Sequence, residues 1–169
     1  KELWDLVVES ATKTAEPGLL MWDNILKYLP ANEYEDFKTE CVNPCAELPL
    51  SSYDSCRLIS LNLKNFVDSA FEDKASFDFE GFTTAVSAAM RLSDDLVELE
   101  LEKLENLRSA SDQPDEKVLW NKLYETCRNG RRTGLGTHGL ADAIASLNLA
   151  YDSDEAIEII DKIYETLKL

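Results

Sequence analysis

Val42-Asn43-Pro44-Cys45-Ala46-Glu47-Leu48-Pro49-Leu50 is the stretch that decides the fold of this chain and the chemistry it can carry. Its two prolines disfavour a helix and sit poorly inside a sheet, so we expect a loop or finger held by its surroundings. In an extended stretch, alternate residues point the same way. We therefore expect Asn43, Cys45 and Glu47 to bring an amide, a thiol and a carboxyl into one small volume.

This set of groups suits hydrogen-atom or acid/base chemistry on a hydroxylated substrate, and it suits metal binding poorly. A proline-rich loop with a satisfied amide and a buried thiol is the alternative without function. The three residues alone leave these two interpretations balanced. A second thiol, Cys56, follows Cys45 by eleven residues.

The composition describes an ordinary globular protein. The chain has 169 residues, of which 44% are hydrophobic and 30% charged, enough for one domain with a core. Its formal net charge of -16 argues against direct binding to nucleic acid and is more simply a solvated acidic surface. We see no signal peptide and no apolar run of roughly 18 residues, so we expect a cytoplasmic protein without a membrane span. Since a helical pattern is already under way at Lys1, we expect a piece of something longer.

The cysteines argue against a disulfide scaffold and against a zinc site. Four cysteines in a chain of this length are too sparse for a secreted framework, no CxxC pair exists, and the one histidine, His138, has no companion. One or two functional thiols fit better. We expect Cys127 to pack inside a helical region, and Cys41 stays ambiguous.

Hydrophobic periodicity predicts an α/β arrangement in which helices dominate. The longest apolar stripe at helical spacing comprises Phe82, Val86, Ala89, Met90, Leu96, Val97, Leu101 and Leu104. We expect helices over 1–15, 78–107, 116–128, 139–147 and 152–167, and short strands near 19–22, 42, 58–61 and 133–135. For the apolar segment that starts at 19–22, a helix is the alternative to a strand. Asn129-Gly130 should end the helix before it, and 109–115 reads as a linker.

The segment 131–142 holds two further candidates. GLGTHG at 134–139 matches the glycine spacing of a dinucleotide loop, but no convincing βαβ unit surrounds it, so a glycine-rich strand-to-helix turn is the better interpretation. His138 has no carboxylate or thiol at a telling spacing, which favours a structural or exposed histidine. Arg131 and Arg132 could bind a phosphate, but a solvated pair is the simpler expectation.

The motifs together resemble part of the large catalytic subunit of ribonucleotide reductase. NPCAELPL at 43–50 resembles the finger-loop motif NPCGE-x-PL, and CRLISLNL at 56–63 resembles CNLGSINL. Three further stretches are similar to family motifs: LW at 3–4 with EPGLL at 16–20, MRLSD at 90–94, and RRTGLGTHGLAD at 131–142. The matches keep their order and cover essentially the whole chain.

The resemblance implies a role for each candidate residue. Cys45 would be the thiyl-radical cysteine that abstracts the 3′ hydrogen of a ribonucleotide, and Glu47 would take the proton of the 3′ hydroxyl. Asn43 would hydrogen-bond the substrate. Cys56 would be one half of the reducing cysteine pair, whose other half lies upstream of this chain in the family. The specificity-effector loops would also lie upstream, and the phosphate loop and C-terminal barrel strands downstream.

The resemblance also implies a ten-stranded α/β barrel, of which residues 1–169 form one incomplete segment. The expected partners are the remaining segments of the same enzyme, a ribonucleotide substrate and a thioredoxin-type reductant. Pro44 and the short gap to Cys56 are most similar to the adenosylcobalamin-dependent class II enzymes, although no cofactor-binding or metal-binding residue can be assigned here. A class I catalytic subunit and a non-catalytic acidic helical domain are the alternatives.

The chain departs from the family motifs at four positions. Ala46 and Ile59 replace glycines, Val42 replaces threonine, and Arg57 replaces asparagine. Arg57 either lowers the pKa of the neighbouring Cys56 thiol by stabilising the thiolate or marks altered packing.

Overall fold

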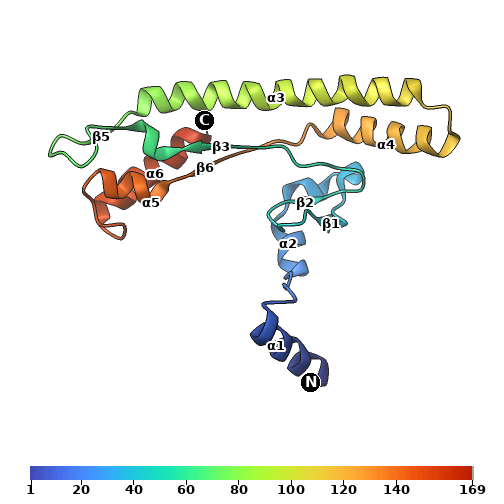
Figure 1. Cartoon of the computed structure of the whole chain (residues 1–169), viewed down its shortest axis with the longest axis horizontal. Coiled ribbons are helices and arrows are strands. Elements are labelled where there is room, and N and C mark those ends of the chain that lie inside the picture. Colours follow the sequence, from blue (N-terminus) through green and yellow to red (C-terminus); the bar gives the residue numbers. More distant parts are fainter. Residues whose placement is uncertain (169) are drawn as a thin grey trace. The chain divides into compact units, whose positions relative to one another are not determined.

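The chain, described for residues 1–168 by a computed structural model, divides into two compact units, Lys1–Ser52 and Tyr53–Leu169 (Figure 1). The first unit contains helices α1 (Glu2–Thr14) and α2 (Trp22–Tyr28) and two 3-10 turns, η1 (Pro30–Glu33) and η2 (Glu35–Phe37). It ends in a hairpin of β1 (Cys41–Val42) and β2 (Pro49–Leu50), paired antiparallel.

The predicted strand at 19–22 is wrong. Leu19 and Leu20 belong to no regular element, and the carbonyl of Met21 accepts the backbone N–H groups of Asn24 and Ile25, which starts α2. Among the described residues, no strand pairs with this short apolar run. The carbonyl of Met21 is instead hydrogen-bonded within the first turn of a helix.

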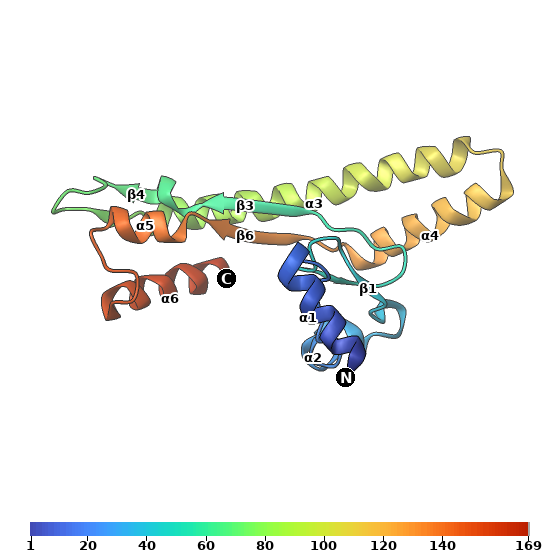
Figure 2. The ribbon, with the colours of Figure 1, turned by 60° about the horizontal axis from the view of Figure 1, so that its bottom comes forward.

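The second unit is built on one parallel strand pair. β3 (Leu58–Asn62) pairs with β6 (Gly134–His138), with Ser60 opposite Gly136. Parallel strands need a crossover connection, and this one runs through the long helices α3 (Phe79–Ala110) and α4 (Pro114–Gly130). These two helices lie side by side (Figures 1 and 2). The expectation of a helix-dominated α/β segment is therefore confirmed.

Shorter elements complete this unit. β3 continues into the 3-10 turn η3 (Leu63–Phe66), and β4 (Val67–Asp68) pairs antiparallel with β5 (Ser76–Phe77). Helices α5 (Leu140–Ser146) and α6 (Asp154–Lys168) follow β6. None of the helices formed by residues 1–168 is long and apolar enough to cross a membrane.

The second unit has two separate cores. The larger one packs the start of α3 against η3, α5 and α6; its buried members are Leu63, Phe77, Phe82, Val86, Ala143, Leu147 and Ile163. The smaller one joins α3 to α4 through Val97, Leu101, Leu104 and Cys127. The predicted stripe is thus confirmed except at Met90 and Leu96, which are 48% and 38% exposed.

Helix ends follow capping chemistry, with one correction. Asp78 caps α3 by accepting the N–H of Gly81 at 2.9 Å, and Ser153 caps α6 by accepting the N–H of Ala156 at 3.2 Å. Asn129 and Gly130 are the last residues of α4, as predicted, but they lie within the helix, which extends past the expected end at 128. The helix runs through Gly130, and Arg131 takes the left-handed conformation with φ of 44°.

Candidate active site

The loop 43–48 between β1 and β2, here called the finger loop, is closed by Asn43 at both of its ends. The backbone N–H of Asn43 donates to the carbonyl of Leu48 at 3.1 Å, and the Leu48 N–H donates to Asn43 Oδ1 at 3.0 Å. The Ala46 N–H donates to the Asn43 carbonyl at 2.9 Å, which turns the chain back. Asn43 therefore holds the loop through its side chain and through both of its backbone groups.

The structure corrects how the three candidate groups come together. The stretch is not extended: it turns, and Ala46 has a positive φ of 64°. Asn43, Cys45 and Glu47 lie on this turn, so the argument from strand alternation does not apply to them. Cys45 and Glu47 are exposed and Asn43 is half-buried. The alternative without function required a buried thiol and a hydrogen-bonded amide. Cys45 is not buried, whereas the Asn43 side-chain amide is hydrogen-bonded.

Cys56 lies in the second unit, half-buried on the segment that leads into β3. No disulfide joins the four cysteines, all of which lie within the described residues. Cys41 is exposed at the start of β1, with its Sγ 3.9 Å from the Leu50 carbonyl oxygen. Cys127 is buried between α3 and α4, as expected.

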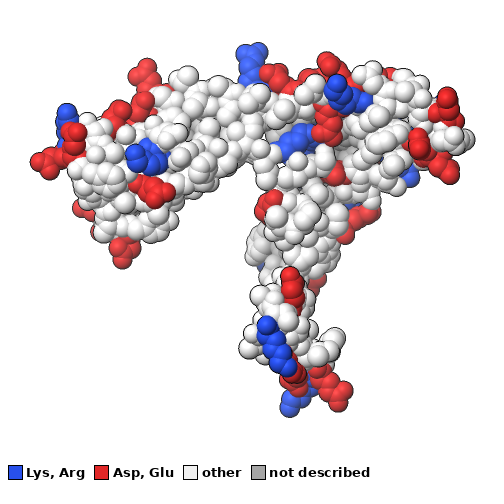
Figure 3. All heavy atoms as spheres, viewed as in Figure 1, with Lys and Arg blue, Asp and Glu red and all other residues white. Residues whose placement is uncertain are grey.

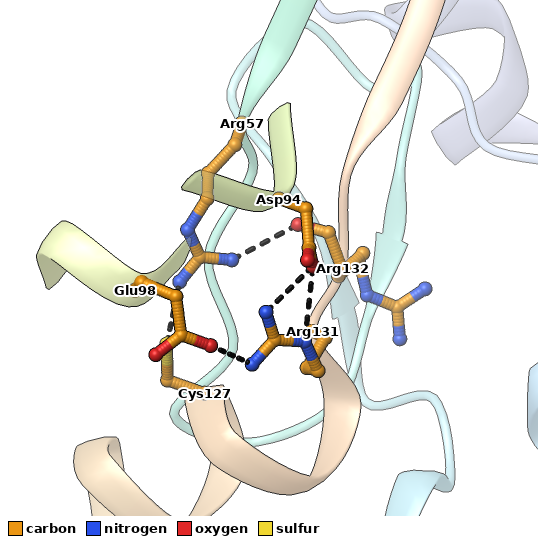
Figure 4. Close-up of polar contacts among 6 residues, drawn as sticks. All are labelled: Arg57, Asp94, Glu98, Cys127, Arg131 and Arg132. Carbon is orange, nitrogen blue, oxygen red and sulfur yellow. Dashed lines mark hydrogen bonds and ion pairs between the residues drawn. The ribbon is translucent and has the colours of Figure 1, made fainter. Parts of the chain in front are cut away.

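Sequence reasoning missed a polar cluster around Arg57 (Figure 4). The Arg57 guanidinium donates from Nε to Glu100 Oε2 at 2.7 Å, to the carbonyl of Arg132 at 2.9 Å and to Cys127 Sγ at 3.0 Å. Its side chain is only 8% exposed. These partners favour the altered-packing interpretation of Arg57. Nothing local in the sequence could reveal them, since Glu100 lies 43 residues away.

Arg132 and Arg131 are both engaged, contrary to the expected solvated pair. Arg132 Nε donates to Asp54 Oδ2 at 2.6 Å, and the Asp54 side chain is 3% exposed. Arg131 contacts Asp94 and Glu98 at 2.6 Å each on the exposed side of α3. These hydrogen bonds raise the pKa of Arg131, so its charge is fixed.

Burial raises the pKa of the Cys127 thiol, and the nearby Arg57 guanidinium partly opposes that rise. The neutral thiol, which packs well among apolar side chains, is therefore the favoured form.

The glycine-rich segment is mostly strand. Gly134 and Gly136 lie within β6, and only Gly139, with φ of 72°, makes the expected turn into α5. A Cβ at Gly139 would stand 2.6 Å from Asn62 Oδ1, so a close approach and a left-handed backbone both require glycine there. His138 is exposed, with Nδ1 2.9 Å from Ser60 Oγ.

Charge is spread over the surface. On the face drawn in Figure 3, acidic side chains are scattered over the molecule, and Lys and Arg side chains lie singly or in small groups among them. Within residues 1–168, no group of three or more His, Cys, Asp or Glu side chains is arranged to hold a metal ion.

Comparisons with known proteins agree with this architecture. A family model described as "Ribonucleotide reductase, barrel domain" matches residues 1–169. The vitamin B12-dependent ribonucleoside-diphosphate reductase of Thermoplasma acidophilum is 33% identical over 163 residues, covering 96% of this chain and 18% of that protein. The Mycobacterium tuberculosis protein of the same name is 28% identical over 167 residues, covering 99% and 21%.

A more distant relative carries a different name. The ribonucleoside-diphosphate reductase large subunit of Variola virus is 26% identical over 165 residues, covering 98% of this chain and 19% of that subunit. The chain thus spans about a fifth of the length of the curated relatives it matches.

A parallel strand pair with a helical crossover is the kind of unit from which an α/β barrel is built, and the family model that matches the chain is that of a barrel domain. The chain belongs to the ribonucleotide reductase family, as a segment of the barrel domain of a catalytic subunit.

Proposed function

We propose that this segment carries the radical thiol and one reducing thiol of an adenosylcobalamin-dependent, class II ribonucleotide reductase. The observation that carries the proposal is the finger loop, in which a family motif places Asn43, Cys45 and Glu47 on one turn with the thiol and the carboxyl exposed. The complete enzyme converts ribonucleotides to deoxyribonucleotides, with other segments of the same protein supplying the rest of the site.

Each group has a chemical task. The Cys45 thiyl radical takes the 3′ hydrogen of the substrate and returns it at the end of turnover. Glu47 removes the proton of the 3′ hydroxyl, which becomes far more acidic once the neighbouring carbon is a radical. Because Asn43 Oδ1 closes the loop, the amide NH2 of Asn43 is the donor that we assign to the substrate.

The reduction itself consumes two thiols. Cys56 and a second cysteine of the enzyme give up two electrons and two protons and become a disulfide, while the 2′ oxygen of the substrate leaves as water. A thioredoxin-type reductant then restores the thiols.

Two relatives are named vitamin B12-dependent reductases, which supports adenosylcobalamin as the radical source. When bound, this cofactor supplies the first radical. The exposed Cys45 fits a thiol that reacts with a group held by another part of the enzyme, and we assign no cobalamin-binding residue to this chain. A class I catalytic subunit is the second candidate, favoured by the likeness to the Variola virus subunit.

Serine variants in the complete enzyme test the two thiols separately. Cys45→Ser should abolish release of tritium from the 3′ position, because a serine hydroxyl holds its hydrogen too strongly to form the radical. Cys56→Ser should still release tritium but stall without clean deoxynucleotide. Exchange of the 3′ hydrogen by Cys45→Ser, or normal multiple turnover by Cys56→Ser, would refute the assignment. Loss of activity without adenosylcobalamin separates class II from class I.

A further inference from the structure

The residues on both sides of Cys56 are anchored to the helices of the second unit. Ser55 Oγ donates to Glu100 Oε1 at 3.2 Å, and Arg57 donates to Glu100 Oε2 at 2.7 Å, so one carboxylate on α3 holds both neighbours of the cysteine. One residue earlier, Asp54 accepts from Arg132 at 2.6 Å. A segment without helix or strand is thus held by these side chains and by the backbone N–H of Gly134, which donates to the Arg57 carbonyl at 2.8 Å.

We call Asp54, Arg57, Glu100, Cys127 and Arg132 the Arg57 clamp. Arg57 uses Nε and both of its terminal nitrogens within it, and Figure 4 shows its guanidinium directed toward Cys127 and the Arg132 backbone. A charge that is 8% exposed is tolerated only when it is paired and hydrogen-bonded. Loss of one partner would leave part of the buried Arg57 guanidinium unsatisfied.

The clamp rests on rigid supports. Glu100 is on α3 beside Leu101, and Cys127 is on α4; the core that joins these helices contains both Leu101 and Cys127. On the other side of Cys56, Leu58 begins β3, which is paired along its length with β6. The position of the Cys56 backbone therefore follows from helix packing and sheet pairing.

The same helices offer a natural comparison in Arg131. Its ion pairs with Asp94 and Glu98 are each 2.6 Å long, the same length as the Arg132–Asp54 pair of the clamp. The side chains of Arg131, Asp94 and Glu98 are, however, 35%, 62% and 59% exposed. Exposed pairs of this kind contribute little to a fold. Arg131 also contacts no residue of the segment 54–57 in any of these bonds.

We infer that Arg57 and Glu100 are positioning residues for the reducing thiol, holding the segment 54–57 so that Cys56 meets its substrate and its disulfide partner. The inference rests on the proposed function of Cys56. It separates two steps of the reaction: the clamp acts on reduction and leaves 3′-hydrogen abstraction by Cys45 unaffected.

The test compares Arg57→Gln with Arg131→Gln in the complete enzyme. Misplacement of a reacting group by about 1 Å can cost about 100-fold in rate, so Arg57→Gln should lower multiple-turnover deoxynucleotide formation at least about tenfold. Release of 3′ tritium should stay within about twofold of the unmodified enzyme, because Cys45 is untouched. Arg131→Gln should change both rates less than about twofold.

A second measurement reads the thiol directly. The rate at which iodoacetamide alkylates Cys56 is measured in the reduced enzyme by peptide mass spectrometry, with Cys45 as the internal reference. This rate should change at least about threefold in Arg57→Gln and should not change in Arg131→Gln. Glu100→Gln keeps the size of the side chain and removes its charge, so it should show the same pattern more weakly. If Arg57→Gln does not fold, Glu100→Gln tests the inference by the same two comparisons: product formation against tritium release, and alkylation of Cys56 against that of Cys45.

Two results would overturn the inference. A parallel fall of tritium release and product formation would make Arg57 a general stability residue, and equal behaviour of Arg57→Gln and Arg131→Gln would make the clamp irrelevant. Failure of the proposed function looks different, since it would appear as normal multiple turnover by Cys56→Ser or as 3′-hydrogen exchange by Cys45→Ser, whatever the clamp variants do.

Discussion

At the scale of single residues, the finger loop depends on one side-chain hydrogen bond and on one residue with an unusual backbone conformation. Asn43 closes the loop through its side chain, and Ala46 occupies the left-handed region at φ of 64°. The family motif that the chain resembles has glycine at the position of Ala46. An alanine Cβ crowds the following carbonyl in this conformation, whereas glycine adopts it freely. The chain thus carries local strain next to its proposed radical thiol.

Ala46→Gly should relieve that strain. We expect the free energy of unfolding to rise by about 0.5 kcal/mol, because the relief exceeds the added freedom of glycine in the unfolded chain. Ala11→Gly, on the exposed face of α1, is the matched control and should lower stability by about 1 kcal/mol. Urea unfolding of the three proteins measures both changes. Destabilisation by Ala46→Gly would show that residue 46 does not hold the left-handed backbone.

At the scale of elements, α3 organises the second unit. One end of the helix covers the core that contains Phe82, and the other packs on α4 through Val97 and Leu101. Between them, Ser93 takes a buried position and returns its hydroxyl to the Ala89 carbonyl at 3.0 Å. Apolar periodicity predicts the helix but misjudges which apolar side chains face inward, since Leu96 is exposed.

Alanine substitutions at two leucines of α3 compare a buried position with an exposed one. Leu101 is 8% exposed and Leu96 is 38% exposed, so the same substitution is made in two environments on one helix. Leu101→Ala should lower the free energy of unfolding by about 2–3 kcal/mol through lost burial and the cavity it leaves. Leu96→Ala should cost about 0.5 kcal/mol or less. Equal midpoints for the two variants in urea unfolding would contradict the assigned α3–α4 core.

At the scale of the whole molecule, the chain leaves apolar surface uncovered. No residue of α1 is buried, and its Leu3, Trp4 and Leu6 are 75%, 58% and 61% exposed. β3 and β6 form a sheet of only two strands among the described residues, so both outer edges have backbone groups open to further pairing. Both features fit a segment that spans about a fifth of its relatives.

We expect the 169-residue chain alone to form no deoxynucleotide, even with ribonucleotide, adenosylcobalamin and dithiothreitol present. The reducing partner of Cys56 and the phosphate-binding loop are assigned to other segments of the enzyme. Addition of those segments, purified separately, should restore turnover, and a mixture carrying Cys45→Ser is the control. Product formation by the chain without them would contradict the proposed division of the site.

The sequence by itself determined the family and the type of most elements, and it supplied the candidate thiols. Motif spacing points to Cys45 and Cys56 as the proposed functional thiols, and local periodicity predicts α3, because both signals lie within neighbouring residues. Tertiary structure alone decided the turn at Ala46 and the loss of the strand predicted at 19–22, since each depends on which backbone groups find partners. It also decided the Arg57 clamp. Its ion pairs join residues 43 and 78 positions apart, and only the packing of α3 and α4 brings them into contact.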